Sequence, residues 1–301
     1  MPSLQHAVVS RVIPILRRNM SPDDIPAMRA AMTRDNRAAR EGPPRDVRRT
    51  HQESIGNAHG FPVFTLWPAG TTAPERAVLY LHGGAYVRPS DERHWRFATK
   101  LADALGARAV LPLYPLAPEF TVRDSFEELV AIFEVVARQS PGGVVLAGDS
   151  AGGGYALALA EALRDRGGAQ PEHLVLVAPW VDLTGSTPGT LEASARDPWL
   201  SYVHLSIYAS FWAGTDDPYQ LADPRVSPGL GELAGLPPTL MLCGTRDLLQ
   251  PACDALFARA DVADWPLEYV VAPDLIHVYP LLPIPEAREA FDQIVRFCTH
   301  G

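Results

Sequence analysis

One hexapeptide, Gly148-Asp149-Ser150-Ala151-Gly152-Gly153, constrains the fold of this 301-residue chain more than any other segment. It directly follows the apolar run Gly143–Ala147 and leads into a helical stretch. A serine can stand in a sharp turn between a strand and a helix only if the residues two before and two after it are nearly without side chains. Gly148 and Gly152 meet that requirement. The hexapeptide therefore predicts a strand, a strained turn with Ser150 at its tip, and a helix.

From about residue 60 onward, short aliphatic or β-branched runs alternate with longer helical stretches. Continuous apolar strands separated by helices are typical of a parallel sheet that is covered on both faces, so we predict an α/β fold. The expected strands are Pro62–Leu66, Ala77–Leu81, Ala107–Leu113, Gly143–Ala147, His173–Val177, Thr239–Cys243 and Leu267–Val271. The expected helices are Arg93–Leu105, Asp124–Arg138, Gly154–Arg166, Pro251–Arg259 and Pro285–Phe297.

The first 50 residues lie outside this alternation and have a helical, polar-rich pattern. Ser21 is an expected helix N-cap, and Pro22 suits the first turn that would follow it. The apolar stripe Ile25, Met28 and Met32 then indicates one buried helix face. A second amphipathic segment is expected around residues 8–16. These helices are expected either to pack on the body of the domain or to form part of a lid.

Residues 180–236 also break the alternation, because they contain no good strand and are too long for a loop in a compact domain. We interpret this segment as a helical insertion. Its aromatic side chains are candidates to line a substrate pocket, although the alternative is that most of them hold the insertion together. The pocket candidates are Trp180, Trp199, Tyr208, Phe211 and Trp212, together with Tyr86 from an earlier segment.

Composition excludes several classes of protein. The formal net charge of −9 argues against a nucleic-acid binder, which usually has a basic face. The three cysteines have no motif spacing, so neither a disulfide framework nor a zinc site is expected. No clear signal peptide and no apolar window long enough to span a bilayer are present, and a soluble cytoplasmic protein without membrane insertion is the expectation.

The hexapeptide in its strand–turn–helix setting is a nucleophile elbow of the α/β-hydrolase type, in which the triad follows in the order serine, acid, histidine. His277 follows the strand Leu267–Val271 by a short loop, at the end of the sheet where active-site groups collect. His173, His204 and His300 are placed less well. Among the acids, Asp247 follows the strand Thr239–Cys243. Asp274 is the second choice, and a helix N-cap is the alternative role for Asp247.

A nucleophilic serine also needs donors for the oxyanion. His82-Gly83-Gly84-Ala85 follows the strand Ala77–Leu81, and its glycines allow backbone N–H groups to approach a substrate oxygen. A further donor is expected from the N–H of Ala151, the residue after the nucleophile. His82 is expected to be structural and to hold this loop by hydrogen bonds.

Taken together, these segments resemble the hormone-sensitive-lipase-like family of esterases. The matching residues are His82-Gly83-Gly84-Ala85, the hexapeptide 148–153, Asp247 and His277-Val278-Tyr279, with secondary matches at residues 114–119 and at 223–228. The resemblance implies an eight-stranded, mostly parallel sheet and oxyanion donors at Gly83, Gly84 and Ala151. It also implies an N-terminal helical cap segment, residues 1–50, and a catalytic domain, residues 51–301, with residues 180–236 inserted as a helical cap. Departures from the family pattern are Pro89, Pro115 and Pro251.

We therefore expect a serine carboxylesterase that hydrolyses small to medium acyl esters through Ser150, His277 and Asp247, with no metal and no organic cofactor. The alternatives are a lactone, carbamate or amide hydrolase on the same triad. A further alternative is a non-catalytic ligand-binding receptor on this fold. The expected partner is a small-molecule ester, and the resemblance adds a possible homodimer.

Overall fold

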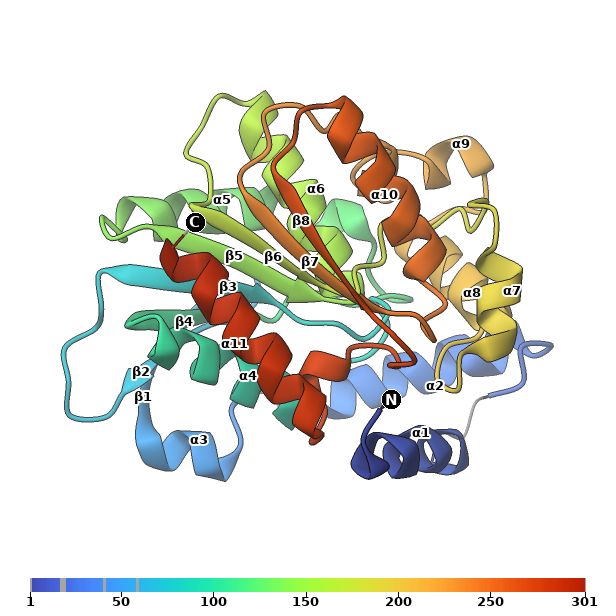
Figure 1. Ribbon diagram of the computed structural model, residues 1–301, viewed down its shortest axis with the longest axis horizontal. Coiled ribbons are helices and arrows are strands. Elements are labelled where there is room, and N and C mark those ends of the chain that lie inside the picture. Colours follow the sequence, from blue (N-terminus) through green and yellow to red (C-terminus); the bar gives the residue numbers. More distant parts are fainter. Residues whose placement is uncertain (1, 17–19, 40–41, 58–59, 301) are drawn as a thin grey trace.

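A computed structural model describes residues 2–16, 20–39, 42–57 and 60–300 of the chain (Figure 1). Its centre is one eight-stranded sheet with the strand order β1-β2-β4-β3-β5-β6-β7-β8. β2 runs antiparallel to both of its neighbours, and every other pair of strands is parallel. The predicted α/β-hydrolase fold with a mostly parallel, eight-stranded sheet is confirmed.

The strands agree with the sequence pattern wherever that pattern is apolar. Strands β4, β5, β6 and β7 are buried along their whole length, as expected for strands with helices on both faces. The bounds are β1 His51–Gly56, β2 Val63–Pro68, β3 Arg76–Leu81, β4 Ala107–Pro112, β5 Val144–Asp149, β6 His173–Val177, β7 Thr239–Gly244 and β8 Leu267–Ala272. The edge strand β1 was not among the seven expected runs, because four of its six residues are exposed and its sequence is mostly polar.

The helices form two layers around the sheet (Figure 1). Helices α4 (Glu92–Ala104) and α11 (Pro285–His300) cover one face, and α5 (Phe126–Arg138), α6 (Ala151–Asp165) and α10 (Gln250–Val262) cover the other. The short 3₁₀ turns are η1 Val122–Asp124, η2 Pro228–Leu230 and η3 Tyr279–Leu281. This arrangement brings the carboxyl ends of the parallel strands together at one rim of the sheet.

The remaining helices gather beside that rim (Figure 1). They come from the N-terminal segment and from the insertion: α1 Leu4–Leu16, α2 Ile25–Ala38, α7 Thr190–Arg196, α8 Tyr202–Ala213 and α9 Pro218–Leu221. The short helix α3 (Arg45–Thr50) leads into the sheet. Contacts join the two groups, since His204 of α8 hydrogen-bonds the carbonyl of Met20 at 3.0 Å and the guanidinium of Arg29 lies over the ring of Phe211 at 4.3 Å.

The start of α2 differs from the prediction. The helix begins at Ile25, and its N-cap is Asp24, whose carboxylate accepts the N–H of Ala27. Ser21 lies in the preceding turn, where it hydrogen-bonds Asp23 instead. Asp24 is the better-placed cap because Pro26 then falls in the first turn, where a missing N–H costs nothing. Of the predicted apolar stripe, Met28 and Met32 are buried and Ile25 is exposed.

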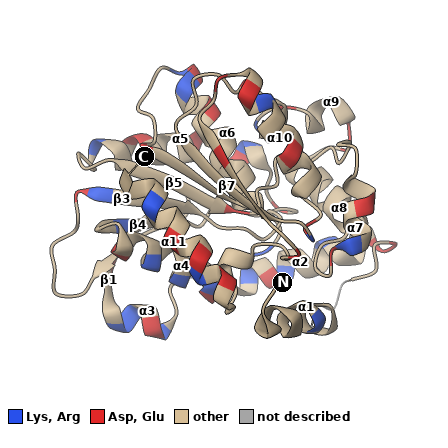
Figure 2. Ribbon diagram, viewed as in Figure 1, with Lys and Arg blue, Asp and Glu red and all other residues tan. Residues whose placement is uncertain are grey.

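Charged residues of both signs are scattered over the helices, and the strands carry few of them (Figure 2). Over the ranges that the structure describes, no helix combines the length and the apolar character that crossing a membrane would require. The cytoplasmic location and the homodimer stay predictions.

Candidate active site

Ser150 stands in a strained turn between β5 and α6. Its backbone has φ +52° and ψ −122°, a conformation that residues other than glycine rarely adopt. A methyl group on Gly148 would collide with the Gly152 carbonyl, and one on Gly152 would collide with the carbonyl of Leu81. The two glycines therefore permit the turn that lifts the serine hydroxyl above the rim of the sheet.

Three side chains from separate parts of the sequence meet at this rim. His277 lies in the loop after β8, and its Nε2 is 2.9 Å from the hydroxyl oxygen of Ser150. Its Nδ1 is 2.8 Å from Oδ2 of Asp247, which lies in the loop between β7 and α10. All three residues are buried. The second carboxylate oxygen of Asp247 accepts the N–H of Leu249 at 2.9 Å, which fixes the orientation of the carboxylate.

The alternative candidates lie elsewhere. Asp274 is exposed, and its N–H donates to the hydroxyl of Thr245. His173 is at the first residue of β6, which is the opposite end of that strand from the rim. His300 is the last residue of α11. The helix-cap role for Asp247 is not seen, because the N-cap of α10 is Leu249.

The electrostatics favour a charged form of the imidazole. Burial lowers the pKa of His277, but the charge and the hydrogen bond of Asp247, together with the charges of Asp197 and Asp149, outweigh burial and raise that pKa above its ordinary value. A histidine with a raised pKa accepts a proton from a neighbouring hydroxyl more readily, which suits a general base.

The hydrogen bonds of the loop after β3 contradict one predicted oxyanion donor, Gly83. The N–H of Gly83 donates to Oδ1 of Asp149 at 2.9 Å, so it is not available to a substrate. Tyr80 donates to the same oxygen at 2.6 Å, and a side chain on Gly83 would overlap the Asp149 carboxylate. The prediction for Gly83 is therefore wrong. Glycine is required at position 83 because the carboxylate of Asp149 lies too close for any side chain.

The next residues along the loop have free donors. In the described part of the chain, the N–H groups of Gly84, Ala85 and Ala151 donate to no protein acceptor. Gly84 and Ala85 have positive φ angles, +118° and +54°, and both line the same pocket as Ser150. Ala151 is the first residue of α6, where an N–H has no acceptor within the helix. Ala85 was not named as a donor from the sequence.

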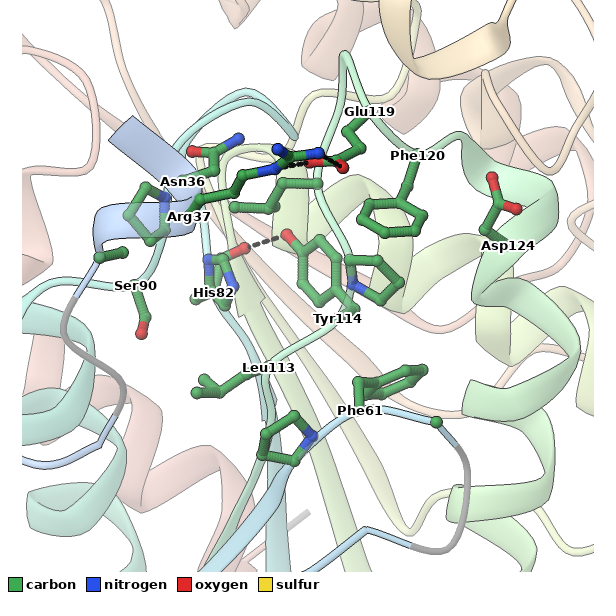
Figure 3. Close-up of a pocket in the computed structure, with 16 residues that line it drawn as sticks. Asn36, Arg37, Phe61, His82, Ser90, Leu113, Tyr114, Glu119, Phe120 and Asp124 are labelled. Atoms are coloured by element: carbon green, nitrogen blue, oxygen red, sulfur yellow. Dashed lines mark hydrogen bonds and ion pairs between the residues drawn. The ribbon is translucent and has the colours of Figure 1, made fainter. Parts of the chain in front are cut away.

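His82 supports this loop from behind. It is buried, its Nδ1 is 2.7 Å from the Gly83 carbonyl, and its ring stacks on Tyr114 with the centroids 4.5 Å apart. The hydroxyl of Tyr114 donates to the carbonyl of His82 at 2.6 Å (Figure 3). Burial lowers the pKa of His82 to about 4, so its imidazole is neutral near pH 7. This agrees with a structural role.

Two cavities flank the loop. The one that contains Ser150 and His277 has a volume of about 160 Å³. The other, of about 420 Å³, lies behind His82 and Tyr114 and is bordered by Phe61, Phe120 and the ion pair of Arg37 with Glu119 (Figure 3). The larger cavity contains neither Ser150 nor His277 in its lining, and we assign the chemistry to the smaller one.

The predicted pocket aromatics divide into two groups. Trp180, Trp199 and Tyr208 line the cavity that contains Ser150, and the ring of Trp199 meets His277 edge to face at 5.7 Å. The other three do not line it. Tyr86, Phe211 and Trp212 are buried, and Tyr86 stacks on Trp212 with the centroids 4.3 Å apart. In the described residues, no group of three or more His, Cys, Asp or Glu side chains is arranged to hold a metal ion.

Comparison with known families agrees with this geometry. The sequence pattern of the alpha/beta hydrolase fold family matches residues 78–281, which include all three residues that meet at the rim. The chain is an α/β hydrolase. An acetyl-hydrolase from Streptomyces hygroscopicus is 36% identical to this hydrolase over 80% of the chain and 84% of its own length. An esterase from Acinetobacter venetianus is 29% identical over 74% of each protein.

A solved esterase from the bacterial hormone-sensitive lipase family has the same fold as this hydrolase. The two superpose with a TM-score of 0.80 at 27% identity, over 99% of this chain and 98% of the other. The predicted family is confirmed, and so is the predicted enzyme class, a carboxylic ester hydrolase. The alternative of a non-catalytic receptor is set aside.

The pocket of the hydrolase also contains two residues that the sequence analysis does not place there. Arg93 lines it, is bound to the carboxylate of Asp91, and lies over the ring of Trp199 at 5.4 Å. His204 of α8 lines it as well. Neither belongs to a local motif, so only the three-dimensional contacts reveal them.

Proposed function

We propose that this hydrolase cleaves esters of small to medium acyl groups through an acyl-enzyme on Ser150. The observation that carries the proposal is the unbroken hydrogen-bonded series Asp247–His277–Ser150, with separations of 2.8 Å and 2.9 Å, beside three backbone N–H groups that donate to no acceptor among the described residues. That combination supplies a nucleophile, a base, a group that orients the base, and donors for a developing negative charge.

In the first step, the hydroxyl of Ser150 attacks the ester carbonyl carbon while its proton passes to Nε2 of His277. The carbonyl oxygen becomes an oxyanion that the N–H groups of Gly84, Ala85 and Ala151 hold. Asp247 keeps the proton on Nδ1 of the imidazole and stabilises the imidazolium. The imidazolium then protonates the leaving alkoxide, the C–O bond breaks, and the alcohol departs.

In the second step, water replaces the alcohol. His277 removes a proton from the water as it attacks the acyl carbonyl, the same three N–H groups hold the second oxyanion, and the returned proton releases Ser150 and a carboxylic acid. Each step restores the protonation state in which the next one begins. The reaction needs no group beyond the chain and water.

The dimensions of the site support a small acyl group. The cavity of about 160 Å³ is below the usual range for pockets that hold drug-sized ligands, roughly 300–1,000 Å³. Trp180, Trp199 and Tyr208 give it an aromatic wall. We propose further that residues 1–50 and 180–236 together act as a cap, because both contribute helices beside the rim and contact each other there.

The test has two parts. The first is reaction with a fluorophosphonate probe, followed by mass spectrometry, which should find one adduct on the peptide that contains Ser150. The second is a series of aryl esters from acetyl to decanoyl, together with a lactone, a carbamate and an anilide of matched size. We expect kcat/KM to be highest for the short esters. An adduct elsewhere, or faster turnover of the lactone, carbamate or anilide, would contradict the proposal.

A further inference from the structure

Asp197 joins two parts of the active site that are far apart in the sequence. It follows the last residue of α7 in the inserted segment. Its Oδ1 accepts the N–H groups of Trp199 at 2.6 Å and Leu200 at 2.9 Å, and its Oδ2 accepts the N–H of Leu248 at 2.7 Å. The partly buried carboxylate therefore bridges the insertion and the loop after β7.

Both ends of this bridge touch the proposed catalytic groups. Leu248 directly follows Asp247, and the next N–H along, that of Leu249, is held by Asp247 itself. On the other side, Trp199 and Leu200 line the cavity, and the Trp199 ring contacts the His277 imidazole. His277 thus lies between the carboxylate of Asp247 and the ring of Trp199. The carboxylate of Asp197 hydrogen-bonds the backbone beside each of these two residues.

We propose that Asp197 is a positioning residue for ester hydrolysis, which holds the Trp199 wall of the pocket and the Asp247 loop in register around His277. The proposal rests on the function proposed above. The geometry requires a carboxylate, because N–H groups approach both oxygens. An asparagine has a single oxygen and would present an NH₂ group to one of the two sides.

Charge adds a second effect. The titratable groups that face Asp197 are Asp247, from the loop after β7, and His277, from the loop after β8. Burial and the charge of Asp247 raise the pKa of Asp197 to about 6. While ionised, Asp197 in turn helps to raise the pKa of His277. Removing its charge should therefore lower the pKa of His277 and move the acid limb of activity to lower pH.

Two substitutions separate position from charge. In Asp197→Asn, which loses the charge and one acceptor, kcat should fall roughly 10- to 100-fold and the acid limb of kcat/KM should move down by about half a pH unit to one unit. In Asp197→Glu, which keeps the charge but displaces the oxygens, kcat should fall while the acid limb stays. Glu192→Gln, which removes an exposed carboxylate from the same segment, is the control and should match the parent enzyme.

The outcomes are distinct. If Asp197→Asn does not fold, Asp197→Glu tests the proposal alone. A kcat of Asp197→Glu within about twofold of the parent enzyme then overturns the proposal. Losses confined to KM, or an unmoved acid limb in a folded Asp197→Asn enzyme, also overturn it. Retained activity in Ser150→Ala would instead contradict the proposed function, whatever the Asp197 variants do.

Discussion

The carboxyl rim of the sheet and the inserted segment 180–236 both face the cavity, but different forces hold their side chains there. At the rim, strand geometry and tight turns dictate where Ser150, Asp247 and His277 point, because each follows the carboxyl end of a parallel strand, β5, β7 and β8. In the insertion, the direction of each aromatic ring is decided by packing. Trp199 faces His277, whereas Trp212, thirteen residues later, is fully buried against Tyr86.

The difference teaches that substitutions in the two regions should fail in different ways. A rim residue should change the rate with little effect on stability. An insertion residue should affect either the pocket or the stability, according to whether its ring meets the cavity or the core. The following substitutions test that division.

Ser150→Ala should have the largest effect. Removal of the proposed nucleophile is expected to lower kcat by roughly 10⁴- to 10⁶-fold, with the thermal unfolding midpoint preserved, since the alanine fits where the serine stands. Steady-state hydrolysis of an acetyl ester and thermal denaturation measure the two quantities. Activity close to that of the parent enzyme would remove Ser150 from the mechanism.

Asp247→Asn should come next, with a loss of about 10⁴-fold in kcat, because an amide cannot keep the proton on Nδ1 of His277 in the productive tautomer. Hydrolysis of the same acetyl ester is the measurement. The matched control is Asp254→Asn on α10, whose carboxylate binds Tyr269 and Gln250 at the surface, and it should retain activity. Equal losses in the two variants would mean that Asp247 has no special role.

Trp212→Ala should act on stability rather than on the rate. The ring is fully buried against Tyr86 and Tyr155, so its removal should lower the free energy of unfolding by roughly 3–5 kcal/mol. Denaturant titration measures this quantity. Tyr219→Ala, which removes an exposed ring from the same insertion, should leave the free energy of unfolding almost unchanged. A KM change without loss of stability in Trp212→Ala would place that ring in the pocket after all.

Trp199→Ala should have the smallest effect, and it should lower the rate rather than the stability. An edge-to-face aromatic contact contributes about 0.5–1.5 kcal/mol, so kcat/KM should fall roughly two- to tenfold. The unfolding midpoint should hardly change, because the ring is only partly buried. Trp199→Phe retains a ring edge and should recover most of the activity. If the alanine variant lost stability instead, the division between the two regions would not hold.

The sheet and the residues at its rim could be predicted from the sequence more fully than the inserted segment. Buried strands could be read from the sequence, because apolar runs flanked by helical stretches have few other solutions. The polar edge strand β1 could not, since four of its six residues are exposed and its sequence therefore contains no apolar run. Ser150, Asp247 and His277 could be placed from strand ends and chain order, and their atoms lie within hydrogen-bond reach.

The oxyanion loop and the insertion show where local patterns stop being informative. Gly83 looks like a donor from its place after His82, but its N–H is occupied by Asp149, which is 66 residues away in the sequence. Asp197 belongs to no motif, and its link to the loop after β7 exists only through its contact with Leu248. In both cases a carboxylate that is distant in the sequence accepts a backbone N–H. The spacing of residues in the sequence does not predict either hydrogen bond.

The stack of Tyr86 on Trp212 has a consequence for anyone who wishes to alter the substrate range by exchanging segments. Tyr86 directly follows the proposed oxyanion donors and has a positive φ of +60°, and its ring lies nearly parallel to Trp212, with 3° between the planes. The insertion thus packs against the loop that holds the proposed donors, and it also lines the pocket. A transplanted insertion without an indole at this position would lose this stack and the stability that it contributes, so a useful chimera must exchange residues 86 and 212 as a pair.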